Sequence, residues 1–262
     1  MHTTKLFASR LVLLVLLALV LDAVPARAET VNCTAITALP AVITVQGIYC
    51  FTGHLATAIG TGFAIEIQTN NVVLDLNGFK LGGLAAGTGT LATGIYALNR
   101  QNITIKNGTI RGFEFGILLQ DSGASQGHVV EDIRADQNTL QGISVAGSGN
   151  IVRNNQVVAT GGSTILGADP NAFGIFVGGA GPRVLNNDVI DTVKQGTGTA
   201  WGIHFSLATD GVAVNNRITN ADRGIEFDNG PPGPGSTGKY RDNLTFGVTT
   251  PFTGGTNVGN NN

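Results

Sequence analysis

The amino-acid sequence predicts an all-β fold, a right-handed parallel β-helix of about seven coils. Three observations predict it. A glycine followed by alternating apolar residues recurs along the chain, an Asn-rich phrase lies between these segments, and short apolar runs alternate with glycine-rich turns throughout. Repeats with a period of 20–50 residues are typical of solenoids and propellers.

The first repeated phrase is Gly-apolar-x-apolar, and its glycines lie 22 to 32 residues apart. It begins at Gly62, Gly94, Gly116, Gly142, Gly174, Gly202 and Gly224. Such alternation gives a strand that can bury only one face. Coils stacked about 4.8 Å apart bury that face against the coils above and below, whereas a single unit cannot. A propeller is disfavoured because its blades run to ~40 residues, and no Leu-x-x-Leu-x-Leu phrase indicates leucine-rich repeats.

The second repeated phrase is apolar-x-Asn-Asn-x-apolar, with Asn107 in a variant form and full versions at 152–157, 184–189 and 213–218. Asn tolerates left-handed backbone angles, and its amide can bond to the equivalent Asn one coil away. We therefore expect a corner ladder, rather than a sugar-binding site, formed by Asn107, Asn154, Asn186 and Asn215.

The N-terminus has the form of a signal peptide over residues 1–28. Lys5 and Arg10 precede the apolar run 11–21, and Ala26-Arg27-Ala28 has the small-x-small form of a cleavage site. The run is shorter than the ~20 residues of a membrane-spanning helix. We expect a secreted or periplasmic protein that is free of the membrane after cleavage.

The remaining residues 29–262 are predicted to form a single domain, with an N-terminal cap over 29–61, coils over 62–230, and a C-terminal cap and tail over 231–262, of which residues 256–262 are expected to be flexible. Cys33 and Cys50 are the only two cysteines. In an oxidising compartment they are expected to form a disulfide within the first cap.

The charge balance excludes some partners. The leader contains three of the 15 basic and one of the 17 acidic residues, which leaves 12 against 16 and a net charge near −4. Nucleic acids and anionic membranes require clustered Lys and Arg, which this chain lacks. Metal sites have little support, because no two histidines have ligand spacing on one strand and no nonapeptide calcium repeat is present. No cofactor is therefore expected, although calcium held by loop oxygens remains an alternative.

At Val72-Val-Leu-Asp-Leu-Asn-Gly-Phe-Lys-Leu-Gly-Gly the chain resembles the β-helix repeat proteins of the pectin-lyase-like superfamily. The resemblance implies one of several activities, because the superfamily includes polysaccharide lyases, galacturonan hydrolases, alginate epimerases and accessory proteins of copper-enzyme maturation. The epimerase motif Asp-Pro-His-Asp is replaced by Asp169-Pro170-Asn171-Ala172, and the hydrolase motifs Gly-His-Gly and Arg-Ile-Lys are missing, so no family site is carried over.

Stacked Gly-Ile strands should place equivalent outward residues in columns. The first predicted column is Ala64, Tyr96, Leu118, Ser144, Phe176, His204 and Glu226, and the second contains Glu66 and Asp228. His204, Glu226 and Asp228 are the candidate catalytic residues, since two carboxylates two residues apart begin ~6.6 Å apart and an imidazole one coil away can share a proton. Tyr96 and Phe176 could stack on sugars, and Arg223 and Lys239 could neutralise an acidic substrate. Each of these charges could equally be solvated surface at the end of a solenoid.

These residues predict a protein that acts on a polysaccharide containing uronic acid, by lyase or C5-epimerase chemistry rather than hydrolysis. The alternatives are a non-catalytic β-helix that binds a glycan or a protein along the same face, and an envelope accessory protein. The scarcity of His and Met in the mature chain argues against direct copper binding.

Overall fold

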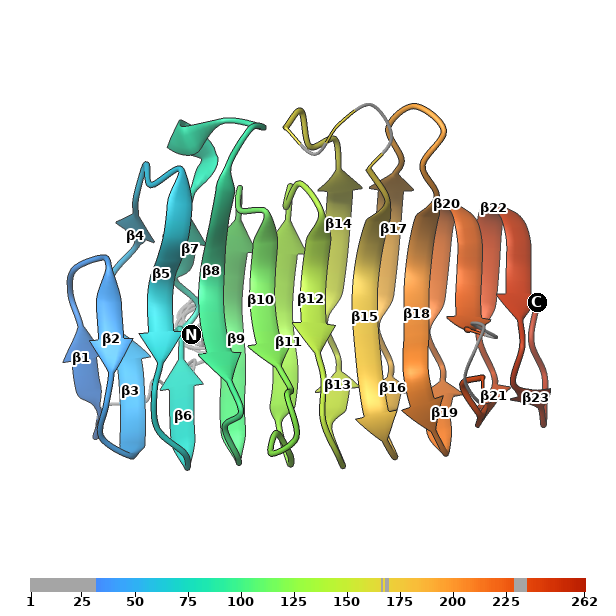
Figure 1. Ribbon diagram of the computed structural model, residues 1–262, viewed down its shortest axis with the longest axis horizontal. Helices are drawn as coiled ribbons and strands as arrows, with labels where there is room; N and C mark the ends of the chain where they lie inside the picture. Colours follow the sequence, from blue (N-terminus) through green and yellow to red (C-terminus); the bar gives the residue numbers. More distant parts are fainter. Residues whose placement is uncertain (1–31, 166, 168–169, 229–234) are drawn as a thin grey trace, which may run out of the picture. The chain divides into compact units, whose positions relative to one another are not determined.

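The chain winds into a parallel β-helix (Figure 1). The computed structural model describes residues 32–165, 167, 170–228 and 235–262, so the predicted signal peptide lies outside the described residues. Within them, 23 strands join in one parallel sheet, accompanied by a short 3-10 helix, η1 (Leu84–Ala86). The pairing pattern divides this sheet into three faces, which the chain visits in turn.

The first face contains the Gly-Ile strands and is called the Gly-Ile face. It comprises β2 (Ala41–Ile43), β5 (Thr61–Ile67), β8 (Leu91–Leu98), β10 (Phe115–Gln120), β12 (Gln141–Val145), β15 (Ala172–Ala180), β18 (Ala200–Thr209) and the second halves of β20 (Arg217–Phe227) and β22 (Leu244–Thr253).

The second face follows each Gly-Ile strand. It comprises β1 (Thr34–Ile36), β3 (Gly47–Phe51), β6 (Val72–Asp75), β13 (Ile151–Arg153), β16 (Arg183–Leu185), β19 (Gly211–Val214), β21 (Gly238–Arg241), β23 (Thr256–Asn257) and the first halves of β9 (Ile103–Arg111) and β11 (Val129–Asp136).

The third face closes each coil. It comprises β4 (Leu55–Ala56), β7 (Lys80–Gly82), β14 (Gln156–Gly161), β17 (Asp188–Val193), the second halves of β9 and β11, and the first halves of β20 and β22. Each repeat therefore has three strands, one more than the minimum of two that the sequence repeats indicate.

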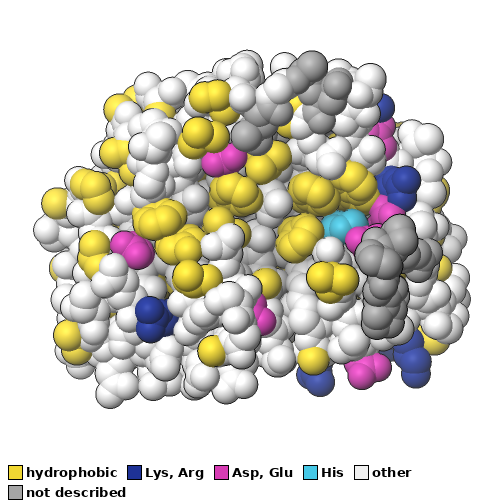
Figure 2. Space-filling model, viewed as in Figure 1, with side chains coloured by type: hydrophobic (Ala, Val, Ile, Leu, Met, Phe, Trp, Pro, Cys, Tyr) yellow, Lys and Arg dark blue, Asp and Glu magenta, His cyan; other side chains and the backbone are white. Residues whose placement is uncertain are grey.

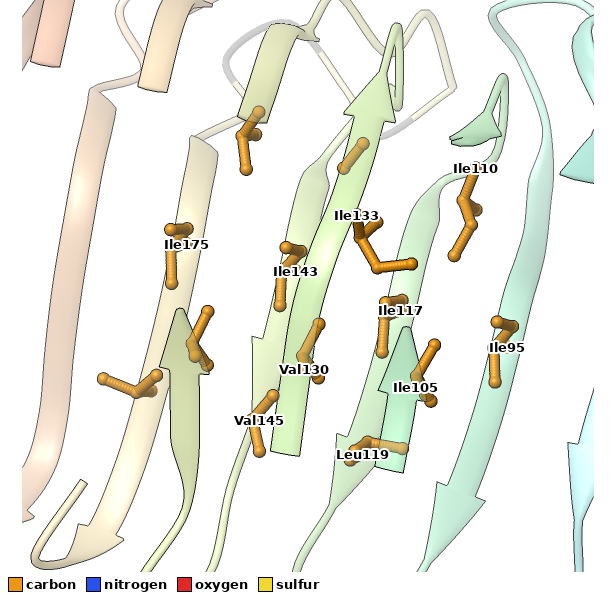
Figure 3. Close-up of a cluster of buried hydrophobic side chains, with 14 of the residues drawn as sticks. Ile95, Ile105, Ile110, Ile117, Leu119, Val130, Ile133, Ile143, Val145 and Ile175 are labelled. Atoms are coloured by element: carbon orange, nitrogen blue, oxygen red, sulfur yellow. The ribbon is translucent and has the colours of Figure 1, made fainter. Parts of the chain in front are cut away.

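Isoleucine columns fill the interior (Figure 3). The isoleucine of each Gly-Ile phrase pairs with the next along the face, and every one is at most 1% exposed: Ile65, Ile95, Ile117, Ile143, Ile175, Ile203 and Ile225. Burying such a side chain contributes about 1.5–3 kcal/mol. The predicted register is thereby confirmed from Ile95 onward.

The register of the first coil differs from the prediction. Glu66, rather than Ala64, pairs with Tyr96, because the strand that follows Gly62 carries two extra residues before its inward Ile65. Ala64 is buried, so it cannot be an outward residue. Glu66 therefore lies in the first column and not in the second.

The glycines before the inward isoleucines Ile143 and Ile175 are required by a close approach between faces. A Cβ on Gly174 would lie 2.4 Å from Cγ1 of Val189 on the third face, and a Cβ on Gly142 would lie 2.5 Å from Cγ1 of Val157. Neither distance is compatible with a larger side chain unless the corner moves.

The Asn-Asn corner carries two ladders. Asn154, Asn186 and Asn215 have φ near 55° and bond amide to amide on the outside, as predicted. Asn107 has the same backbone conformation, but its amide donates to Asp75 Oδ1 at 3.2 Å, so it lies outside this ladder.

The second ladder is buried and was not predicted. The residue after each outer Asn points inward, and Nδ2 of each donates to Oδ1 of the next coil at 3.0 Å: Asn155, Asn187, Asn216, Asn243 and finally Asn261. The first four of these residues are at most 2% exposed. This row satisfies backbone groups that a tight buried corner would leave unpaired.

Both predicted caps are wound into the ladders. β1 pairs with β3, and β21 and β22 pair with β19 and β20, so parallel pairing extends into residues 29–61 and 231–262. Asn261 ends the inner ladder, and the carbonyl of Asn262 accepts from Thr245 N, so the last residues bond to the solenoid.

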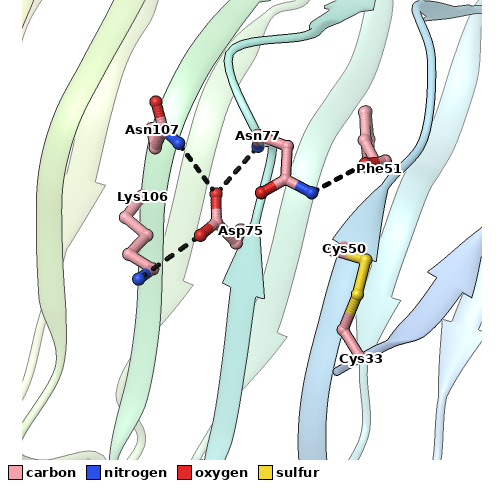
Figure 4. The surroundings of a disulfide bond; sticks show 7 residues. All are labelled: Cys33, Cys50, Phe51, Asp75, Asn77, Lys106 and Asn107. Atoms are coloured by element: carbon pink, nitrogen blue, oxygen red, sulfur yellow. Dashed lines mark hydrogen bonds and ion pairs between the residues drawn. A yellow bond between two sulfur atoms is a disulfide. The ribbon is translucent and has the colours of Figure 1, made fainter. Parts of the chain in front are cut away.

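The predicted Cys33–Cys50 disulfide is confirmed and joins β3 to the segment that precedes β1 (Figure 4). Next to it lies a buried carboxylate, Asp75, which accepts from the backbone N–H of Asn77 and forms an ion pair with Lys106 at 3.3 Å. The same region thus combines a covalent link with a satisfied polar network.

A buried histidine at the corner between the first two faces should make stability depend on pH. His128 Nδ1 accepts from Ile103 N, Nε2 contacts Ser125 Oγ at 2.8 Å, and burial lowers the pKa of His128 from 6.5 to about 4. Since the folded state binds the proton less tightly, this stabilisation is complete above pH 6.5 and disappears as the pH falls towards 4. The loss should reach roughly 3 kcal/mol.

The variant His128→Asn tests this expectation, because its Oδ1 can replace Nδ1 as acceptor and does not titrate. Urea unfolding at pH 7 and pH 4 should show a smaller loss of unfolding free energy for the variant than for the parent protein. Equal losses in the two proteins would assign the acid sensitivity to other groups.

Candidate functional site

Two outward rows run along the Gly-Ile face. One row is formed by the residue that immediately precedes each strand glycine: Thr93, Phe115, Gln141, Phe173, Trp201 and Arg223, with Phe63 paired to Thr93 in the first coil. The other row is Glu66, Tyr96, Leu118, Ser144, Phe176, His204 and Glu226. Figure 2 shows the result as a hydrophobic band along the long axis, which ends at a histidine flanked by acidic and basic side chains.

Aromatic rings dominate the C-terminal half of the band. Phe173 and Trp201 stack with centroids 4.7 Å apart and planes 7° from parallel, while Phe176 meets Phe173 edge-on at 5.5 Å. These three rings come from adjacent coils, β15 and β18, whose parallel register holds them in place. Rings of this kind offer flat apolar surfaces to a ligand.

His204 packs among these rings. Its centroid lies 5.3 Å from those of Phe173 and Trp201 and 5.4 Å from that of Phe176. The residue is 7% exposed, and burial lowers the pKa of His204 below its ordinary value. The carboxylates of Glu226 and Asp228 oppose this shift, and Nδ1 is buried without a hydrogen-bond partner among the described residues.

Glu226 lies one coil further on, paired in register with His204 as predicted. Its Oε2 accepts from the Trp201 indole N–H, and its Oε1 accepts from Arg223 Nη1 at 2.5 Å. Arg223 also lies over the Trp201 ring, 5.8 Å from the centroid. Both oxygens of the buried Glu226 carboxylate are therefore used to hold Trp201 and Arg223.

Asp228 lies at the end of this site, whereas Tyr96 lies far from it. The backbone N–H of Asp228 donates to Phe205 O just after β20 ends. The negative charge of the Asp228 carboxylate interacts with the His204 imidazole and raises its pKa, against the effect of burial. Tyr96 lies in the same column as His204 but four coils earlier, which corresponds to about 19 Å.

Lys239 does not belong to this site, which corrects the prediction. It lies in β21 on the second face, paired with Val212. The prediction followed closeness in sequence to Arg223, but the chain turns onto another face between the two residues.

The predicted columns did not include Trp201 and Phe173, because those columns contain only positions that come after each glycine of the repeated phrase. The available signal was the residue before the glycine, which is aromatic in Phe115-Gly116, Phe173-Gly174 and Trp201-Gly202.

Two further findings bear on the site. Among the residues that the structure describes, no cluster of three His, Cys, Asp or Glu side chains could hold a metal ion. No helix in the same part of the chain is long and apolar enough to cross a bilayer.

Solved structures of the same fold include two phage tailspikes. Tailspike protein 2 of bacteriophage CBA120, whose structure is of its enzymatically active domain, is 16% identical with a TM-score of 0.54, over 86% of this chain and 38% of that one. The Dettilon tailspike protein gp208 is 14% identical with a TM-score of 0.51, over 82% and 56%. This chain thus spans less than two thirds of either tailspike chain.

The A-module of the mannuronan C-5 epimerase AlgE6 from Azotobacter vinelandii is 11% identical with a TM-score of 0.48, over 88% of this chain and 86% of that one. No curated protein sequence matches this chain significantly. The family model described as the right handed beta helix region matches residues 42–171 and 93–262. The chain therefore belongs to the right-handed β-helix family, with a pectin-lyase-like fold.

Proposed function

We propose that this protein acts on a polysaccharide that lies along the Gly-Ile face, and that His204 removes a proton from a uronic acid residue. The observation that carries the proposal is the His204 imidazole, which is buried among Phe173, Phe176 and Trp201 and has its pKa lowered by burial. A neutral imidazole next to a sugar-sized aromatic surface is suited to general base catalysis. A buried nitrogen without a partner also calls for a functional explanation.

The proposed step is a proton transfer that requires no redox partner. His204 takes the C5 proton, and the electron pair moves into the substrate carboxyl group as an enediolate. In a lyase, the C4–O bond then breaks, its oxygen leaves with the proton that His204 took, and a C4–C5 double bond forms. In an epimerase, a water molecule donates a proton to C5 from the opposite face, and His204 returns its proton to the solvent.

Arg223 is the group proposed to neutralise the substrate carboxylate. Its Nη1 is committed to Glu226, but a guanidinium has five N–H donors, and the side chain is 39% exposed. Asp228 is proposed to modulate the charge around His204. Hydrolysis is a weaker candidate, because a glycosidase needs one carboxylic acid free to protonate the leaving oxygen and both oxygens of Glu226 already accept hydrogen bonds.

Non-catalytic glycan binding is the second candidate. It is favoured by one observation: stacked aromatic pairs lie on both parts of the Gly-Ile face, Phe63 with Tyr96 and Phe173 with Trp201, whereas a single imidazole lies on it. A binding module would retain polysaccharide along the same face but would leave C5–H intact.

The discriminating experiment follows proton abstraction directly. The protein is incubated in D2O with polygalacturonate, polymannuronate, polyguluronate and glucuronoxylan, and NMR follows deuterium at C5 while absorbance follows unsaturated chain ends. Deuterium entry supports the proposal, and unsaturated ends identify a lyase. Binding to one of these polymers with neither exchange nor unsaturated ends would establish the module instead. Lys239→Ala, on another face, is the matched control and should behave like the parent protein.

We also propose that the protein is exported. The Cys33–Cys50 disulfide supports this proposal because such bonds persist in oxidising compartments. Mass spectrometry of the exported chain should show a first residue of Glu29, after cleavage behind Ala28.

A further inference from the structure

We infer that the N-terminal part of the Gly-Ile face holds a second saccharide-binding site, separate from His204. The site is an open hollow of about 480 Å³ on β5 and β8, lined by an aromatic pair, a carboxylate, a guanidinium and two amides: Phe63, Glu66, Gln68, Tyr96, Asn99 and Arg100. The left part of this face in Figure 2 carries acidic and basic side chains beside the hydrophobic band.

An aromatic platform forms one wall of the hollow. Phe63 and Tyr96 stack with centroids 3.9 Å apart and planes 5° from parallel. The Tyr96 hydroxyl donates to Gln120 Oε1 at 3.0 Å, which fixes the ring on its strand. Both rings remain partly exposed, so the apolar face of a pyranose can stack against this pair.

The polar groups of the hollow have unused hydrogen-bonding capacity. Among the described residues, neither Glu66 nor the side chain of Arg100 forms an ion pair or a hydrogen bond, and Arg100 Nε is buried without a partner. A carboxylate that accepts and a guanidinium that donates, set beside an aromatic platform, match the vicinal hydroxyls of a sugar. This chemistry indicates a pyranose residue as the ligand.

The position of the hollow allows one polysaccharide chain to contact both the hollow and His204. Tyr96 lies about 19 Å from His204 along the column, a distance that several sugar residues of an extended chain would span. This role rests on the proposed function, in that the same polysaccharide is proposed to occupy both places. A chain long enough to reach both sites would bind more tightly than a short one, because its second contact is intramolecular.

The experiment uses the single tryptophan, Trp201, as a reporter of the His204 end. Disaccharides and hexasaccharides of galacturonate, mannuronate, xylose and α-1,4-linked glucose are titrated in two ways. Calorimetry detects binding anywhere on the protein, and Trp201 fluorescence detects binding near His204. For the hexasaccharide that binds best, Tyr96→Ala and Arg100→Gln should each weaken affinity about tenfold. The affinity of the matching disaccharide, measured by the change in Trp201 fluorescence, should be the same in these variants as in the parent protein. Lys239→Ala is the control.

The outcomes separate the two proposals. Unchanged hexasaccharide affinity in both variants, or no saccharide bound by calorimetry, would overturn the second site. Tyr96-dependent binding with neither deuterium exchange at C5 nor unsaturated chain ends would support the second site and refute the proposed catalysis. Circular dichroism of each variant verifies that the solenoid remains folded, as expected for partly exposed side chains.

Discussion

His204→Gln is expected to lower the rate of C5 proton removal, measured as deuterium exchange or as formation of unsaturated ends, at least about 100-fold, because a general base contributes typically 10²–10⁴-fold to a proton-transfer step. Gln fills much of the space between Phe173, Phe176 and Trp201 but cannot accept the proton. Affinity for the polysaccharide should stay within a few-fold, since the aromatic rings remain. Single-turnover exchange rates and calorimetric titration of the same preparation make this comparison.

The pH profile provides a readout that a purely structural role would not alter. Because burial lowers the pKa of His204, its neutral form persists below pH 6.5, and exchange should decline only at a lower pH. The residual activity of His204→Gln should lack this acid limb. If the variant keeps the parent rate, or the same acid limb, His204 is not the base.

Sequence periodicity predicts much of this fold because each coil repeats the same physical requirement. An inward isoleucine needs a partner one coil away, so the Ile95 to Ile225 column follows from the repeated phrase alone. The same repeat predicts that His204 lies beside Glu226, as the pairing of β18 with β20 shows. It fails for Glu66, where the first strand carries two extra residues and the pattern contains no signal of the shift.

The parts that sequence reasoning missed depend on turns of variable length. Lys239 lies only 16 residues after Arg223, yet it lies on another face, because the chain leaves the Gly-Ile face after β20 and joins the second face in β21. The stacking of Trp201 on Phe173 and the bond from Trp201 to Glu226 require side-chain directions on two coils at once. Such contacts follow from tertiary register and not from the local sequence.

The inner Asn ladder leads to the second large effect, a loss of at least about 3 kcal/mol of unfolding free energy in Asn187→Ala. Asn187 Oδ1 accepts from both N and Nδ2 of Asn155, and its Nδ2 donates to Val152 O. Removing the side chain takes this partner from Asn155 N and Val152 O, at about 1–3 kcal/mol for each buried group. It also leaves one hydrogen of Asn155 Nδ2 unpaired, while that amide keeps its bond to Val130 O. Urea unfolding at neutral pH measures the change.

Asn186→Gly is the matched control, because Asn186 lies one residue earlier in the exposed ladder with φ of 55°. Glycine accepts this backbone angle, and the lost bonds face water, so the loss should stay below about 1.5 kcal/mol. Solenoids can unfold in parts, so hydrogen exchange at the Asn155 amide, which bonds to Asn187, provides a local measurement. Faster exchange there in Asn187→Ala but not in Asn186→Gly would locate the stabilisation in the buried row. Similar exchange and similar stability in the two variants would mean that the inner amides contribute no more than the exposed ones, and that the isoleucine columns alone hold the coils together.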